Sequence, residues 1–217
     1  MPFSETSSEV SKTPETSKLD VDADKLIGSE ARESKTEAGD VKDREPVDPD
    51  RLIESAQHEH FDDNGELYRV GDNLLPNKAY ELNGYTYHTD SQGRIKSAEG
   101  QLHIDNSPRK NISSSMEAIG KGDQRESDQR GHLIADRFGG SNGLENNVAM
   151  DGKVNQGDYK AIENRCAKAL EAGKDAYMKV TPKYEGNSNR PTAFRVAYVI
   201  DGEKTVVTLK NGGGSQK

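Results

Sequence analysis

The sequence contains no tryptophan and only one cysteine, and 30% of its 217 residues are hydrophobic against 31% charged. So little apolar material cannot fill one dense core along the whole chain. No run of about 18 apolar residues occurs, which excludes a membrane-spanning helix and argues against a membrane partner. The first five residues lack the basic and apolar regions of a signal peptide, so export would need another route or a larger parent protein.

The single cysteine, Cys166, permits neither an internal disulfide nor a cysteine-based zinc site. It lies in the segment 162–170, where apolar residues recur at helical spacing and the thiol falls on the inward face. Because a free cysteine behaves as a small hydrophobic residue, we interpret it as a buried structural thiol.

The net charge of −8 argues at first sight against a nucleic-acid partner. Residues 1–50 hold 7 basic and 14 acidic side chains, or −7, which leaves about −1 for residues 51–217. The segment 161–217 has 10 basic and 6 acidic side chains, or +4. An enzyme acting on nucleic acid needs only a local positive groove, so the charge neither supports nor excludes such a partner.

Residues 1–50 are rich in Ser, Thr, Glu, Lys and Asp and almost free of aromatic side chains. Such a segment cannot bury enough apolar surface to offset its ordering entropy. We therefore predict a disordered acidic leader over 1–50, with Pro46 and Pro49 at its boundary, and a folded domain over 51–217.

The folded part carries strand and helix patterns in turn. Alternation of apolar and polar residues predicts strands, and one long segment has helical spacing. The predicted elements are strands at 67–70, 80–89, 94–104, 193–200 and 205–209, turns at 90–93 and 201–202, a short helix at 114–119 and a principal helix at 156–171. Together they predict an α+β domain with an antiparallel sheet.

The most informative stretch is 128–140, in which His132 follows an Arg-Gly step, leads into a short apolar segment and ends at a glycine pair. An asparagine-rich run follows at 142–147, and Asn155-Gln156-Gly157 open the principal helix. Hydrolysis of a phosphodiester requires a base, positive charge at the transition state and help for the leaving oxygen. A histidine can act as base at neutral pH, and an asparagine carbonyl can bind a hydrated Mg²⁺ ion.

Three segments carry a family resemblance: Gln129-Arg130-Gly131-His132, Asn147-Val148-Ala149-Met150 and Asn155-Gln156-Gly157, with Glu163 further along the same helix. They resemble the DNA/RNA non-specific endonuclease family, which belongs to the ββα-metal, or His-Me finger, nucleases. The similarity spans roughly 128–165 and implies a nuclease core of that fold.

The resemblance also implies a role for each matching residue. His132 would be the general base, and Asn155 would be the single protein ligand of Mg²⁺ or Mn²⁺. Asn147 would orient the site, Glu163 would support the water shell of the metal, and Arg130 would contact phosphate.

This chain departs from the family motif at one position, because Gln129 stands where members have aspartate and Asp128 lies one place earlier. The compact loop between His132 and Asn155 is typical of small toxin-like members, which form the C-terminal tip of secreted bacterial toxins and meet a dedicated immunity protein. We therefore expect a metal-dependent, sequence-nonspecific endonuclease of DNA and possibly RNA. Such an effector is secreted or delivered into a target cell and has nucleic acid and an inhibitory protein as partners.

Two alternatives remain at this stage. A catalytically inactive module of the same fold would bind nucleic acid or protein, and Gln129 and the acidic balance are its support. A sequence-specific HNH-type enzyme would need a second metal-binding histidine downstream, and no histidine follows His132.

Several residues also have simpler interpretations. Asn155 is a favourable N-cap for a helix over 156–171, and this role is compatible with metal binding. His58-Glu59-His60 has two histidines without a third ligand and is interpreted as the end of a strand or helix. Lys179, Lys183 and Arg190 would line a substrate groove or lie on the ordinary surface.

Overall fold

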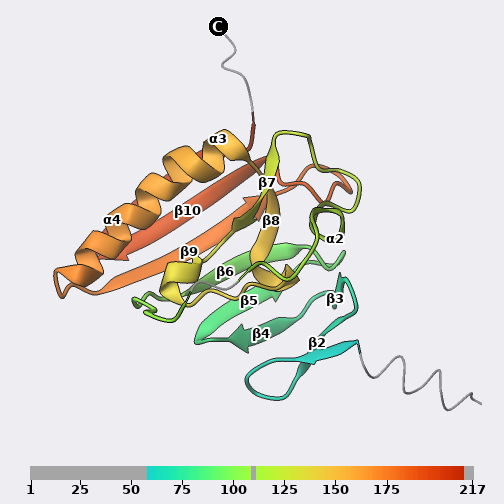
Figure 1. The fold of residues 1–217 in the computed structure, drawn as a ribbon, viewed down its shortest axis with the longest axis horizontal. Helices are drawn as coiled ribbons and strands as arrows, with labels where there is room; N and C mark the ends of the chain where they lie inside the picture. Colours follow the sequence, from blue (N-terminus) through green and yellow to red (C-terminus); the bar gives the residue numbers. More distant parts are fainter. Residues whose placement is uncertain (1–57, 109–110, 213–217) are drawn as a thin grey trace, which may run out of the picture. The chain divides into compact units, whose positions relative to one another are not determined.

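The computed structural model describes residues 58–108 and 111–212 of the chain. These residues form sheets of three, six and two strands, and every strand pair is antiparallel (Figure 1). The combination of antiparallel sheets with a few helices confirms the predicted α+β class. The leader predicted over 1–50 and the first seven residues of the predicted domain lie outside the described residues.

The six-stranded sheet has the order β11-β10-β9-β6-β5-β4. Its strands are β4 (Ala79–Leu82), β5 (Tyr85–Thr89), β6 (Ile95–Gln101), β9 (Ala176–Lys183), β10 (Ala193–Ile200) and β11 (Glu203–Lys210). The small sheet before it contains β1 (Glu59–Phe61), β2 (Leu67–Val70) and β3 (Asn73–Leu74), and the two-stranded sheet pairs β7 (Asp128–His132) with β8 (Asn147–Asp151).

The run 80–89, predicted as one strand, is a hairpin of β4 and β5. Asn83 and Gly84 have φ of 56° and 78°, the left-handed values of a tight two-residue turn. The Asn-Gly pair interrupts a sequence that otherwise keeps strand alternation, so the prediction of a continuous strand was wrong. The turn at 90–93 and the hairpin of β10 and β11 were predicted correctly.

Strand β9 was not predicted, although its residues alternate between buried and exposed. Pro182 is unusual inside a sheet, because proline has no N–H to donate. The β6 partner pairs only with Tyr177–Val180, so Pro182 extends past that neighbour and pairs with β10 alone. The proline therefore costs the β6–β9 ladder no hydrogen bond.

The helical segments lie between β6 and β9 in chain order. They are α2 (Met116–Gly120), the 3-10 turns η1 (Asp136–Phe138) and η2 (Leu144–Asn146), α3 (Gly152–Val154), the π-helical turn η3 (Asn155–Tyr159) and α4 (Lys160–Glu171). The last three run on as one helix with a kink at Gly157.

This long helix begins at Gly152, because the Asp151 side chain caps it by accepting a hydrogen bond from the Lys153 N–H at 2.9 Å. The interpretation of Asn155 as the N-cap was therefore wrong. The helix begins one turn earlier and places Asn155 inside it.

Tyrosines supply most of the large aromatic side chains of the core, since the sequence contains no tryptophan. Tyr80, Tyr85, Tyr87 and Tyr159 are almost completely buried, and the rings of Tyr68, Tyr80 and Tyr87 form a continuous stack. The long helix lies over the six-stranded sheet (Figure 1), where the ring of Tyr159 meets that of Phe194 edge-on at 6.1 Å.

Cys166 is buried on the same helix and has no disulfide partner, as predicted. Among residues 58–108 and 111–212, no helix combines the length and the apolar character that crossing a bilayer requires.

Candidate active site

Strand β7 places two of the predicted site residues. Arg130 and His132 are two positions apart, so their side chains leave the same face of the strand. Between them, a Cβ at Gly131 would stand 2.6 Å from the Cβ of Met150 in β8. Glycine is therefore the residue that lets β7 and β8 approach each other, and this explains the Arg-Gly-His order.

The long helix places the other two. Asn155 begins the π-helical turn η3, a kind of irregular turn that is frequent at functional sites, and Glu163 lies two turns further in α4. The Asn155 Nδ2 donates to Oε1 of Gln129 at 2.9 Å, and Gln156 Nε2 donates to the same oxygen at 3.1 Å. Gln129 thus joins β7 to the helix and leaves the amide oxygen of Asn155 available for a ligand.

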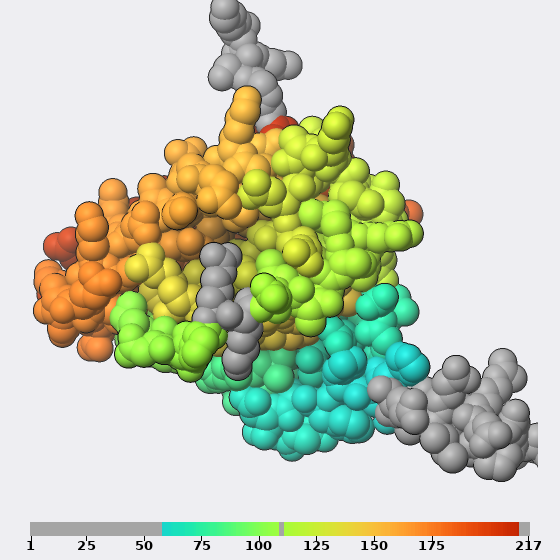
Figure 2. All heavy atoms as spheres, in the orientation of Figure 1, coloured from blue at the N-terminus to red at the C-terminus, as the bar shows by residue number. Residues whose placement is uncertain are grey.

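A groove of about 260 Å³ brings together Arg130, His132, Asn155 and Glu163. Its other lining residues are Ile112, Ala135, Asp136, Arg137, Gln156 and Lys160. In Figure 2 the orange atoms of α4 and the yellow atoms of the segment after β7 share this face of the molecule. The lining is predominantly polar and charged, which suits a hydrated, charged substrate better than an apolar one.

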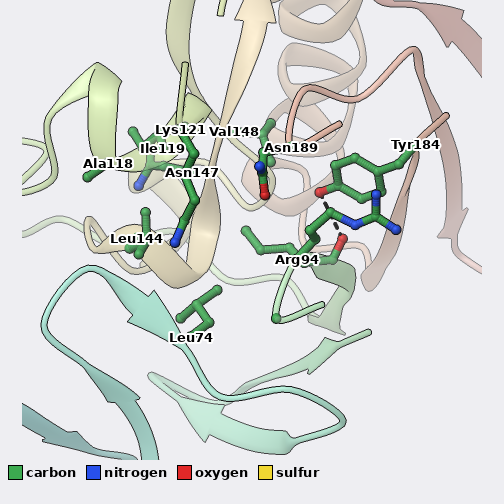
Figure 3. A pocket seen from close by; sticks show the side chains of 12 residues that line it. Leu74, Arg94, Ala118, Ile119, Lys121, Leu144, Asn147, Val148, Tyr184 and Asn189 are labelled. Atoms are coloured by element: carbon green, nitrogen blue, oxygen red, sulfur yellow. Dashed lines mark hydrogen bonds between the residues drawn. The ribbon is translucent and has the colours of Figure 1, made fainter. Parts of the chain in front are cut away.

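Asn147 is the predicted site residue that does not reach this groove. Its backbone pairs with His132, but its side chain is buried and lines a separate cavity of about 30 Å³ with Leu144 and Val148 (Figure 3). Its Nδ2 donates to the carbonyl of Gly143 at 2.6 Å, which closes the turn before β8. Asn147 therefore supports the shape of the loop and is left out of the groove.

Asp128 does not take the place of the motif aspartate, a position that Gln129 occupies in this chain. Its carboxylate is buried and forms a bidentate ion pair with Arg190, with Nε–Oδ2 and Nη2–Oδ1 distances of 2.7 Å each. Arg190 also donates to the carbonyl of Asn211 at 2.9 Å. Neither interpretation of Arg190 holds, because the side chain is buried and links β7 to the segment after β11.

His132 has a side-chain partner that the sequence motif did not identify. Its Nε2 lies 2.7 Å from Oδ1 of Asn142, and Asn142 Nδ2 donates to Oδ1 of Asp136 at 2.8 Å. Asn142 belongs to the asparagine-rich run, but the spacing of the run alone did not indicate which asparagine would meet the histidine. The fold of the loop 136–142 makes this choice.

Glu163 is half-buried at the inner wall of the groove. Burial raises the pKa of its carboxyl to about 7, and the positive charges of Arg137 and Lys160 oppose this rise. Arg137 also donates from Nη1 to the Asn164 side chain at 2.8 Å, whereas Lys160 is exposed. Arg137 and Lys160 are groove residues that motif matching missed, since they lie outside the matched segments.

The donor set of the groove suits a hydrated divalent ion. Across the described ranges, no three His, Cys, Asp or Glu side chains converge on a possible metal position. The groove instead offers the amide oxygen of Asn155 and the carboxylates of Glu163 and Asp136. An ion that keeps several water ligands and takes one or two protein oxygens fits this arrangement.

The other candidate residues have structural roles. His60 in β1 meets the Arg69 guanidinium, with His60 Nε2 and Arg69 Nη2 2.5 Å apart, so it belongs to a contact between strands. Burial lowers the pKa of His60, and the Arg69 charge acts in the same direction. Lys179 pairs with Glu99 at 2.5 Å on the six-stranded sheet and does not line the groove.

A model of a known protein family covers the part of the chain that forms this groove. The family model described as DNA/RNA non-specific endonuclease matches residues 76–202, which include every residue of the groove. The type VII secretion system protein EssD of Staphylococcus aureus (strain USA300) is 36% identical over 137 residues, which are 59% of this chain and 22% of EssD. EssD of strain NCTC 8325 matches to the same extent. The chain thus spans about a fifth of the length of these curated relatives.

A solved structure shares the fold. NucA from Streptococcus agalactiae, determined with a magnesium ion bound, has a TM-score of 0.52 and 19% sequence identity to this chain. The alignment covers 76% of this chain and 88% of the NucA chain. At this identity the likeness concerns the arrangement of helices and strands alone.

Proposed function

Since the family model covers more than half of its length, this chain belongs to the DNA/RNA non-specific endonuclease family, and we propose that it hydrolyses phosphodiester bonds of DNA and RNA without sequence preference. The observation that carries the proposal is the groove of about 260 Å³, in which His132, Asn155 and Glu163 lie together between β7 and the long helix. A base, an oxygen ligand for a divalent ion and a carboxylate beside that ligand are groups that this reaction can use.

In this proposal His132 takes a proton from the attacking water. Arg130, Arg137 and Lys160 provide positive charge for the phosphate and for the developing negative charge of the transition state. Arg130 Nη1 also donates to the carbonyl of Ser114 at 3.2 Å, which holds its guanidinium against the loop before α2. Arginine suits this double role because it carries several donors in a rigid plane.

Asn155 would hold a divalent metal ion through its amide oxygen, and Glu163 would accept hydrogen bonds from the water molecules of that ion. When bound, the ion stabilises negative charge on the phosphate and on the leaving oxygen. We propose Mg²⁺, because a neutral amide oxygen and bound water are hard ligands of the kind that Mg²⁺ prefers, and Mn²⁺ as a substitute. The magnesium ion in the NucA structure is in accord with this choice.

We further propose that the chain acts as a secreted effector nuclease. Its support is the 36% identity to EssD, which is named as a protein of the type VII secretion system. An effector of this kind requires an inhibitory partner in the cell that makes it, so we propose an immunity protein that covers the groove.

The test is cleavage of supercoiled plasmid and of single-stranded RNA by the purified protein with Mg²⁺, with Mn²⁺ and with EDTA. We expect progressive degradation with either metal, none with EDTA, and a loss of about 10²-fold or more for His132→Ala. Asn187→Ala is the matched control, because Asn187 is an exposed loop asparagine whose side chain contacts Gln92. A folded wild-type protein that leaves both substrates intact with either metal would refute the proposal.

The metal assignment has a separate test. Asn155→Ala should weaken Mg²⁺ binding in a calorimetric titration and raise the Mg²⁺ concentration needed for cleavage, whereas Asn187→Ala should change neither. Equal Mg²⁺ affinity in Asn155→Ala and in the wild type would contradict the role of Asn155.

A further inference from the structure

A chain of three side chains links the candidate base to a carboxylate. His132 Nε2 is 2.7 Å from Asn142 Oδ1, and Asn142 Nδ2 is 2.8 Å from Asp136 Oδ1. Asp136 and His132 line the groove itself, whereas Asn142 lines the adjoining cavity of about 190 Å³, which Asp136 shares. Asn142 therefore stands behind the imidazole and bridges it to Asp136.

The chemistry of these groups sets the direction of each hydrogen bond. An ionised carboxylate accepts hydrogen bonds and donates none, so Asp136 must face the NH₂ group of Asn142. The amide oxygen of Asn142 then faces His132, and since an amide oxygen can only accept, Nε2 of His132 must carry a proton. In a neutral imidazole one nitrogen donates and the other holds the lone pair, so the lone pair of His132 is on Nδ1.

Contacts of the surrounding loop hold these three hydrogen-bonded side chains in place. The Asn142 carbonyl accepts from the Ser113 N–H at 3.0 Å, and the Asn146 side chain donates to the carbonyl of Ser141 at 2.7 Å. A Cβ at Gly140 would stand 2.0 Å from the carbonyl oxygen of Ile134, so this close turn requires glycine. These contacts explain why a glycine pair and an asparagine-rich run follow the histidine.

We propose that Asn142 and Asp136 are positioning residues that hold His132 in the tautomer protonated at Nε2, so that Nδ1 is the atom that takes a proton from water. This inference rests on the proposed nuclease function. In the step, an O–H bond of water breaks and an Nδ1–H bond forms, while the water oxygen attacks phosphorus. The leaving oxygen departs with the electrons of the P–O bond and receives a proton from solvent.

The same hydrogen bonds favour the product of proton transfer. Once Nδ1 is protonated the imidazole is positively charged, and its Nε2–H donates to an amide whose far end is bound to the negative Asp136. Among the described residues, the other charged side chains that line the groove are Arg130, Arg137, Lys160 and Glu163. Three of these four are positively charged and destabilise a charged imidazolium. The negative charge of Asp136 offsets part of that destabilisation.

The direct test is the tautomer of His132, read from the ¹⁵N chemical shifts of its ring nitrogens in metal-free protein at a pH where the ring is neutral. The His132→Gln spectrum assigns the signals. We expect pure Nε2–H in the wild type and in Asn187→Ala, and averaged shifts from two tautomers in Asn142→Ala. A wild-type ring protonated at Nδ1, or unchanged shifts in Asn142→Ala, would overturn the inference.

Activity gives a second readout that separates positioning from substrate binding. Asn142→Ala should lower kcat by about tenfold or more, but by less than His132→Ala, and should leave KM nearly unchanged. An unchanged kcat in a folded Asn142→Ala protein would overturn the positioning role of Asn142 and Asp136, even if the wild type cleaves plasmid. An inactive wild type with the Nε2–H tautomer would refute the proposed function instead, and with it the assignment of Nδ1 as the base.

Discussion

Replacing Glu163 with glutamine should make the metal-free protein more stable at pH 8 and less active at every pH. Burial raises the pKa of this carboxyl from 4.5 to about 7 in the folded protein. Between these two pH values the unfolded chain loses the Glu163 proton while the folded protein keeps it. The unfolded state then binds fewer protons, so the free energy of unfolding falls as the pH rises through this window.

The size of the effect follows from the same two values. A difference from 4.5 to about 7, at about 1.4 kcal/mol per pH unit, amounts to about 3 kcal/mol of stability lost by the wild type. The loss begins near pH 4.5 and is complete above pH 7. Glutamine has the same shape and does not ionise, so Glu163→Gln should not lose this contribution.

The assay is urea unfolding in EDTA at intervals from about pH 4.5 to 8.5, because a bound cation would favour the ionised carboxylate and lower its pKa. Glu171→Gln is the control, since Glu171 ends the same helix and is exposed. The stability difference between Glu163→Gln and wild type should grow by about 3 kcal/mol with pH, whereas that of Glu171→Gln should stay constant. A constant difference for Glu163→Gln would refute the argument that its carboxyl is desolvated in the folded protein.

Three further predictions concern the scaffold of the site. Asp128→Asn should lower the free energy of unfolding in urea by about 3–5 kcal/mol, because it leaves the Arg190 charge buried without its partner. Adding Arg190→Met should recover part of this loss, whereas additive losses would contradict a coupled pair. Tyr159→Phe should cost about 1–3 kcal/mol in thermal unfolding, because the Tyr159 hydroxyl donates to the buried Leu133 carbonyl at 2.7 Å; an unchanged Tm would count against this contact. Burial raises the pKa of the Cys166 thiol to about 11, so it should react with a thiol reagent at pH 8 only after unfolding, and rapid reaction in the native state would disprove its burial.

Local sequence determined the elements that a short pattern can specify. The hairpin of β10 and β11 could be predicted because β-branched and aromatic residues flank an Asp-Gly turn, and the burial of Cys166 followed from helical spacing. Asn83-Gly84 was also a turn signal, but it lay inside an alternating run and was missed. Pro182 obscured β9, because proline is unusual inside a sheet. The structure accommodates it because β6 pairs only with the residues of β9 that precede Pro182.

For the site, the sequence by itself determined which residue types are present and how far apart they lie along the chain. The Arg-Gly-His step and the Asn155–Glu163 spacing each depend on one strand or one helix, whose repeat is known from local geometry. Their meeting in one groove depends on how β7 packs beside the long helix, which includes the Gln129–Asn155 hydrogen bond.

Only the tertiary structure decided between side chains that look equivalent in the sequence. Asn142 and Asn147 belong to the same polar run, yet one meets His132 and the other is buried beside Leu144. Asp128 resembles a displaced catalytic aspartate, but its carboxylate is buried against Arg190, 62 residues away along the chain. The physical reason is that burial and long-range hydrogen bonds depend on distances through space, and these are set by packing rather than by the order of residues.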